Sequence, residues 1–118
     1  MSTIIGTGIS TKLDSFAAGK EAALNAYYQI GKTDPGIIIV FISTIFDQDI
    51  AIKGVHSIIK DTPLIGCSSI GSISTHGSCI DSVTVFIISS DSIRISFGIG
   101  REISKNPRLA GHNAAKQA

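Results

Sequence analysis

The sequence predicts an α/β fold with a mixed sheet of about five strands. Ile-rich apolar runs alternate with two stretches of helical periodicity over residues 3–65. Strand, helix, strand, helix, strand in this order favours right-handed crossovers and a parallel sheet. Two further strand-like runs on either side of Ser90 and Asp91 then indicate an antiparallel hairpin, and a C-terminal helix follows.

The first unit is predicted to be a strand at residues 3–9 (TIIGTGI) followed by a helix at residues 15–30. Asp14 or Ser15 can cap this helix, because a side-chain oxygen accepts an N–H group of the first turn. Small residues share one helix face, so the helix can approach a neighbouring element closely. They are Ala18, Ala22 and Ala26. Gly31 ends the helix as a C-terminal cap.

The next strands lie on either side of a second helix. Residues 37–42 (IIIVFI) are apolar at every position, which predicts a central strand that is buried on both faces. Residues 47–60 form a helix, with Asp47 as its cap and with Ile52, Val55 and Ile59 as its apolar stripe. Residues 64–65 form a short third strand. The Ser- and Gly-rich residues 66–78 are expected to be a flexible loop.

The last third of the chain is predicted to contain the hairpin. Residues 82–89 (SVTVFIIS) read as a strand, and residues 93–99 alternate apolar with polar side chains, as a half-exposed partner would. The residues after Pro107 are expected to be helical, because proline is favoured in the first turn.

The C-terminal helix repeats the pattern of the first helix. Both contain A-G-x-x-A-A-x-x-A, beginning at Ala18 and at Ala110, 92 positions apart. The match is either chance among small helix formers or the trace of a duplicated unit. In the second case the chain ends just inside its second copy, and it is a fragment or completes its sheet with another chain. A homodimer is therefore expected.

Composition limits the function classes. The 118 residues suit one domain, and a net charge of +1 with 16% charged residues gives no case for nucleic acid or an anionic membrane. No apolar run approaches the roughly 20 residues of a membrane span. The spacing of Cys67 and Cys79 matches no zinc or redox motif, and no signal peptide is recognised. The chain is expected to be cytoplasmic and reduced, with no metal and no cofactor.

The candidate site is the stretch that follows the third strand, because ligands of open α/β sheets bind at such strand ends. Backbone N–H groups and hydroxyls there suit a small polar ligand. The predicted ligand-binding residues are Gly66, Cys67, Ser68, Ser69, Gly71, His76 and Asp81. The alternative is a structural turn in which Ser and Gly satisfy one another. In that case His76 is merely exposed and Asp81 braces the loop.

An enzyme is the weaker interpretation. A nucleophile elbow requires G-x-S-x-G, and around Ser69 the sequence has Cys67 where the first glycine belongs. A cysteine nucleophile needs a base, and His76 is the nearest histidine, nine residues further on. No catalytic residue is assigned. A hydrolase or transferase that uses Cys67 or Ser69 stays the alternative, as does a truncated domain that only oligomerises.

Several segments resemble the N-terminal FIST sensory domain. They are Phe16-Ala-Ala-Gly19 with Glu21-Ala-Ala23, Ile39-Val-Phe-Ile-Ser43, Leu64-Ile-Gly-Cys-Ser-Ser-Ile-Gly71 and Asp81-Ser-Val83. The resemblance covers nearly the whole chain but about the first half of such a domain, so residues 1–118 are expected to be a single partial domain. It implies an intracellular input domain for small ligands such as amino acids, normally followed by a C-terminal FIST domain and signalling output domains.

Overall fold

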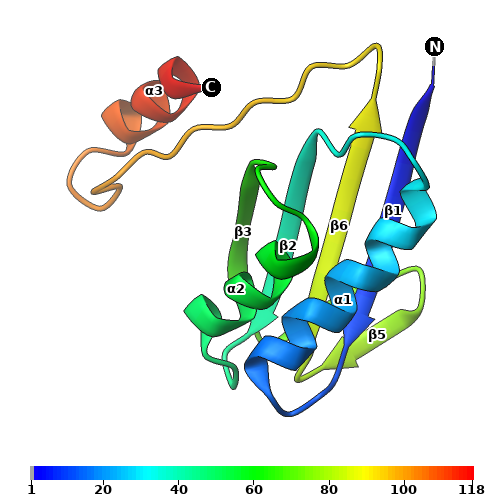
Figure 1. The fold of residues 1–118 in the computed structure, drawn as a ribbon. Helices are drawn as coiled ribbons and strands as arrows, with labels where there is room; N and C mark the ends of the chain where they lie inside the picture. Colours follow the sequence, from blue (N-terminus) through cyan, green and yellow to red (C-terminus); the bar gives the residue numbers. More distant parts are fainter. Residues whose placement is uncertain (1) are drawn as a thin grey trace.

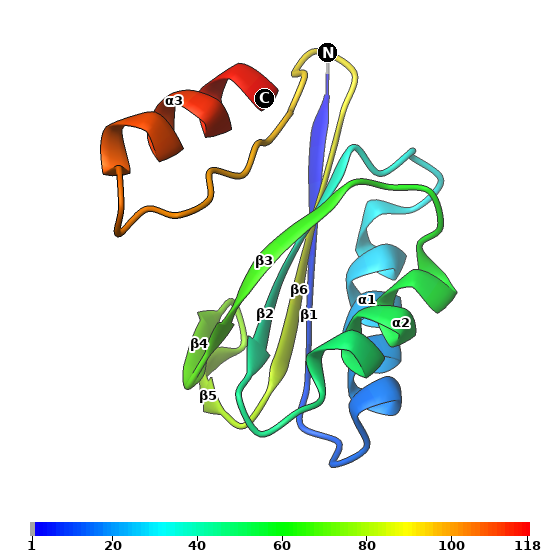
Figure 2. The ribbon, with the colours of Figure 1, turned by 90° about the vertical axis from the view of Figure 1, so that its left-hand side faces the viewer.

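The computed structural model describes residues 2–118 and shows an α/β fold with a mixed sheet, as predicted. The elements are β1 (Thr3–Ser10), α1 (Ser15–Ile30), β2 (Ile37–Ser43), α2 (Gln48–Ile58), β3 (Leu64–Ser69), β4 (Gly71–Ser74), β5 (Gly77–Ile80), β6 (Val83–Ser90) and α3 (Pro107–Gln117). Four strands form the main sheet, and β4 and β5 form a separate hairpin. Figure 2 shows α1 and α2 on one face of the sheet and the β4–β5 hairpin on the other.

The strand order of the main sheet is β1-β6-β2-β3. β2 and β3 pair in parallel, whereas β6 runs antiparallel to both β1 and β2. The strands β1, β2 and β3 therefore point the same way, as right-handed crossovers require. β6 comes after the other three sheet strands in the sequence, yet it lies in the interior of the sheet.

The predicted hairpin between residues 82–89 and 93–99 is wrong, and so is the five-strand arrangement. β6 exists, but both of its edges are already occupied, by β1 and by β2. Residues 93–99 therefore cannot pair with β6, and they lie in an extended segment without strand assignment. Instead of a tight turn, Asp91 exchanges bonds with Ser2: its N–H donates to the Ser2 oxygen (3.3 Å), and its carboxylate accepts from the Ser2 nitrogen (2.8 Å). The chain then leaves the sheet and leads to α3 (Figure 1).

The predicted loop at residues 66–78 is also wrong, because most of it is strand. β3 continues through Ser69 beside β2, and the rest pairs with itself as β4 and β5. A backbone ladder needs only N–H and C=O groups, so hydroxyl side chains are tolerated where a strand is exposed. Most of residues 66–80 are exposed or half-buried.

All three helices begin at the side chains that local patterns indicate. The Asp14 carboxylate accepts from the Ala17 N–H (2.8 Å), and the Asp47 carboxylate accepts from the Ile50 N–H (3.0 Å). Asn106 caps α3 through the Leu109 N–H (3.0 Å). Gly31 follows α1 at a φ of 65°, where glycine is favoured. The helix predictions are thus confirmed within a few residues at each end.

The core lies between α1, α2 and the inner face of the sheet. Its largest fully buried side chains include isoleucines of both layers, each contributing about 1.5–3 kcal/mol of transfer free energy. They are Ile30, Ile38, Ile59 and Ile87. The small face of α1 permits close contact with β1, since Ala18, Ala22 and Ala26 have no exposed surface.

The outer face of the sheet is less covered than the sequence suggests. β2 is central as predicted, and Ile38, Val40 and Ile42 are buried on its helix side. On the outer side, however, Ile39 is half-buried and Phe41 keeps 36% of its surface exposed. The prediction of burial on both faces is confirmed only in part, because Ile37 on the outer side is buried whereas Ile39 and Phe41 are only partly covered.

Candidate functional site

The candidate site lies along β3, which is an edge strand of the main sheet. Two bonds show which of its backbone groups bind β2. The Ile38 N–H donates to the Pro63 carbonyl (2.9 Å), and the Thr44 N–H donates to the Ser69 carbonyl (3.0 Å). In a parallel ladder alternate residues bond to the same neighbour, so the odd-numbered residues of β3 face β2. The N–H and C=O groups of Gly66 and Ser68 therefore point to the open edge.

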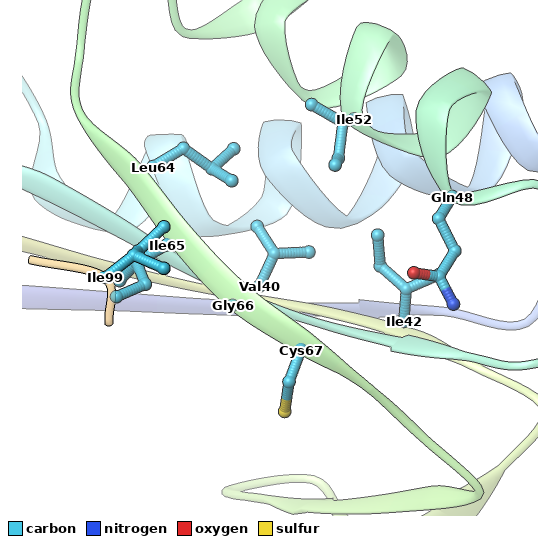
Figure 3. Close-up of a pocket in the computed structure, with 9 residues that line it drawn as sticks. All are labelled: Val40, Ile42, Gln48, Ile52, Leu64, Ile65, Gly66, Cys67 and Ile99. Carbon is cyan, nitrogen blue, oxygen red and sulfur yellow. The ribbon is translucent and has the colours of Figure 1, made fainter. Parts of the chain in front are cut away.

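A groove of about 240 Å³ follows this edge (Figure 3). Its lining is mostly apolar and comes from β2, α2, β3 and the extended segment. The lining residues are Val40, Ile42, Gln48, Ile52, Leu64, Ile65, Gly66, Cys67 and Ile99. Figure 3 shows Leu64, Ile52 and Val40 on the helix side of β3, with the Cys67 thiol on the opposite side. The Gln48 amide supplies a polar side-chain group.

Gly66 has a structural reason to be glycine. It lies opposite Val40 in the β2–β3 pair, and an added Cβ would lie 1.9 Å from the Val40 carbonyl oxygen. No real Cβ contact is that short, so the absence of a side chain lets β3 approach β2 at this point. The residue also exposes its backbone to the groove, and both roles depend on the same missing methyl group.

The groove contains two of the seven residues that the sequence predicts as ligand-binding. Gly66 and Cys67 line it, and both are exposed. Ser68 and Ser69 lie further along β3, beyond the lining, and Gly71 begins β4 opposite Ile80. The expected turn at residues 66–71 is thus an edge strand followed by the start of a hairpin.

The remaining two predicted residues lie around the hairpin and outside the groove lining. His76 is exposed between β4 and β5, and its N–H donates to the Ser74 hydroxyl (3.1 Å). Asp81 links β5 to β6 at a φ of 52°, and its carboxylate accepts from the Ser43 hydroxyl (3.5 Å). The bracing role considered for Asp81 fits this contact.

Hydroxyl groups attach the hairpin to the outer face of the sheet. The Ser72 hydroxyl bonds to those of Thr84 (2.6 Å) and Ser82 (3.2 Å), and Thr75 bonds to Thr7 (3.0 Å). Among the described residues, no buried side-chain nitrogen or oxygen lacks a partner. These hydroxyls satisfy one another and stabilise the hairpin on the sheet.

The described lining of the groove carries no ionised carboxylate and no imidazole. No His, Asp or Glu side chain is among its described lining residues, so Cys67 has no base beside it there. Across residues 2–118, no three or more His, Cys, Asp and Glu side chains gather closely enough to hold a metal ion.

The sequence analysis assigned no ligand role to the other seven lining residues, among them Gln48, Ile52 and Ile99. Gln48 follows the helix cap directly, and Ile52 belongs to the predicted apolar stripe, where a core role was expected. Ile99 belongs to the segment that the sequence places in a hairpin. The position of Gln48 could have indicated its role, because it follows the cap of α2 at the carboxyl end of β2, where ligands of α/β sheets bind.

The fold and the groove define a small α/β domain with a ligand-sized groove at the edge of its sheet. The FIST N domain family matches residues 36–118, and the chain belongs to this family, which is one of sensory domains. The resembling segments from Ile39 onward lie within the matched range, and those around Phe16 precede it. A search of curated proteins returned no match. Within the described residues, no helix has the length and apolar character needed to cross a bilayer.

Proposed function

We propose that this domain is the non-enzymatic input module of a signalling protein and that it binds a small ligand in the groove along β3. The observation that carries the proposal is the open backbone of Gly66 beside an apolar wall, with Ser68 next along the same open edge. An N–H group can hold a carboxylate or carbonyl oxygen, and a C=O group can hold an ammonium group. The Gln48 amide adds one further donor and acceptor.

An amino acid with an aliphatic side chain fits these groups best. Its charged end would bond to the strand edge, and its side chain would pack against Ile52 and Leu64. The groove is smaller than the roughly 300–1,000 Å³ of drug-sized sites, which favours a ligand of amino-acid size. No charged side chain lines it, so selectivity would depend on backbone groups and shape.

Thermal shift with a panel of amino acids and metabolites tests this function. A ligand that binds only the folded state raises the Tm progressively as its concentration increases, and at 100 times the Kd it adds about 2.7 kcal/mol to the free energy of unfolding. Gln48→Ala should weaken the response at least several-fold. Lys53→Gln is the matched control, because it changes an exposed residue of the same helix outside the groove. Absence of any shift with the whole panel contradicts the proposal.

Cys67 distinguishes the sensor from the alternative hydrolase or transferase. In the sensor, Cys67→Ala removes one lining side chain and should leave a ligand-induced shift. In an enzyme, the same variant should abolish a measurable turnover, because the thiolate is the nucleophile. Cys79→Ala in the hairpin serves as the control. A turnover that is lost only with Cys67→Ala would replace the sensory function.

We further propose that the domain acts as part of a larger signalling protein, with output domains joined to it. The support is the family, whose members are sensory domains. Sequencing the gene downstream of the codon for Ala118 tests this organisation directly. Output domains in the same reading frame are the expected result, and an immediate stop codon would contradict it.

A further inference from the structure

Residues 95–102 and α3 repeat the packing of β1 against α1. In both units, two glycines of an extended segment lie directly against the backbone of small helix residues. A Cβ added at these glycines would lie about 2 Å from a helix carbonyl oxygen: Gly6 to Ala26 (2.0 Å), Gly8 to Ala22 (1.9 Å), Gly98 to Ala114 (1.9 Å) and Gly100 to Ala110 (1.9 Å). The strand positions differ by 92, as in the sequence repeat, and the helix contact is shifted by one turn.

In both units, a glutamine side chain of the helix also makes an equivalent hydrogen bond to the strand segment. The side-chain Oε1 of Gln29 accepts from the Thr7 N–H (3.1 Å), and the side-chain Oε1 of Gln117 accepts from the Ile99 N–H (2.9 Å). Thr7 and Ile99 occupy equivalent positions, 92 apart. In each unit the helix thus supplies a side chain that occupies one edge of its strand. Two glycine contacts and one hydrogen bond recur together, which favours duplication over chance.

The two units differ at the other strand edge. In β1, the even-numbered residues bond to β6, as the bond from the Asp91 N–H to the Ser2 oxygen (3.3 Å) shows. The equivalent groups of the second unit belong to Gly98 and Gly100. Within the described part of the chain, the backbone of these two glycines has no hydrogen-bond partner. This edge is open and is bordered by apolar side chains.

The neighbouring surface fits a strand with an apolar face. Ile99 and Leu109 keep 56% and 51% of their surface exposed. Figure 1 and Figure 2 both show residues 95–102 nearer to the main sheet than α3 is. An added strand would therefore lie against α3 in the way that β6 lies against α1, and it would cover apolar surface that the chain leaves open.

We propose that the open edge of residues 95–102 binds an antiparallel β-strand with the alternating apolar pattern of β6. The choice of occupant follows from the repeat: the equivalent edge of β1 is filled by β6, an antiparallel strand without a charged residue. The new strand would bond to Gly98 and Gly100, and its inward side chains would pack on Ala110 and Ala114. This recognition is strand addition to an exposed edge.

A peptide of residues 82–91, with two lysines added at each end for solubility, is the probe. In β6, odd-numbered residues bond to β1 and even-numbered residues bond to β2. N-methylation at Val85 and Ile87 should thus block the edge contact. N-methylation at Thr84 and Phe86 introduces the same backbone restriction on the side that faces away, so it is the matched control.

Fluorescence anisotropy should show saturable binding of the unmodified peptide and of the control peptide. The Val85/Ile87-methylated peptide should bind at least ten-fold more weakly. Hydrogen exchange should show new protection at Gly98 and Gly100, with the amides of β1 unchanged. Absent binding, equal effects of both methylation patterns, or a self-associated chain whose partner copy excludes the peptide would overturn the proposal. The proposal does not rest on ligand binding in the β3 groove, although Ile99 lines that groove and also lies between Gly98 and Gly100.

Discussion

Gly66 combines two effects of one missing side chain. It allows β3 to lie close to Val40, and it opens the backbone to the groove. Sequence composition pointed to this residue, because glycine and serine at a strand end are typical of binding sites. It did not indicate the contact with Val40, since the partner lies 26 positions earlier and pairs only in the folded sheet.

Gly66→Ala should lower the free energy of unfolding by about 1–3 kcal/mol, because the new methyl group overpacks the β2–β3 pair. Urea unfolding followed by circular dichroism measures the change. Gly111→Ala is the control, since no atom lies within 4 Å of its added Cβ and alanine favours a helix. Equal stability of Gly66→Ala and the wild type would show that the sheet relaxes around the methyl group.

Glu21 provides a pH prediction. The hydrogen bond from Lys12 lowers the pKa of its carboxyl group, with a smaller contribution from the Ser10 hydroxyl (2.8 Å). A lowered folded-state pKa means that the stabilisation is present above the unfolded-state pKa and is lost as the pH falls through the folded-state pKa. The effect is modest, since the ion pair is largely exposed. NMR titration of the Glu21 carboxyl carbon should show a lower midpoint in the wild type than in Lys12→Met, and equal midpoints would contradict this cause.

The elements differ in how far the sequence predicts them. The helices were predictable because their signals are local: Asp14 and Asp47 cap them, and Pro107 occupies a first turn. β4 and β5 were not predictable, because their polar residues show no pattern of core burial and the two strands pair only with each other. The extended residues 93–99 carry a strand pattern, yet their conformation depends on whether β6 has a free edge.

The hairpin should loosen when its main hydroxyl contact is removed. Ser72→Ala leaves the Thr84 hydroxyl without its bond of 2.6 Å and costs about 1–3 kcal/mol, because that hydroxyl is buried. Hydrogen exchange should show faster exchange of β4 and β5 amides. Ser78→Ala, at an exposed hairpin position, is the control. Equal exchange in both variants would mean that Thr75 and Thr7 alone hold the hairpin.

For the whole molecule, order along the chain predicted the class of fold but not the order of strands. The three parallel strands followed from two crossovers, whereas the place of β6 is set by its pairing with β1, about 80 residues earlier in the sequence. Only part of the site could be predicted from the sequence, for the same reason. Gly66 and Cys67 are local to the motif, but Gln48 and Ile99 reach the groove from distant elements.

We propose that the chain forms a homodimer through the outer face of the sheet, where Ile5 and Phe41 keep 49% and 36% of their surface exposed. Burial of such apolar surface favours association. Light scattering at micromolar concentration should give twice the monomer mass, and Phe41→Asp should shift it toward the monomer. Thr11→Asp, an exposed substitution outside the sheet, should leave the mass unchanged. A monomeric wild type would contradict the dimer.

The central place of β6 has a consequence for how the chain reaches this structure. β1 precedes β6 in the sequence, and its strand partner is completed only with Ser90, so the sheet cannot close until residues 3–90 have been synthesised. Strands that are so far apart in the sequence pair slowly, because the entropic cost of closing the loop between them arises before the strand contacts can offset it. Until then, α1 can shelter one side of β1, with Gln29 bound along its outer edge. In the structure, the glutamine side chain occupies the outer edge of β1 and the alanine face of α1 covers one of its sides.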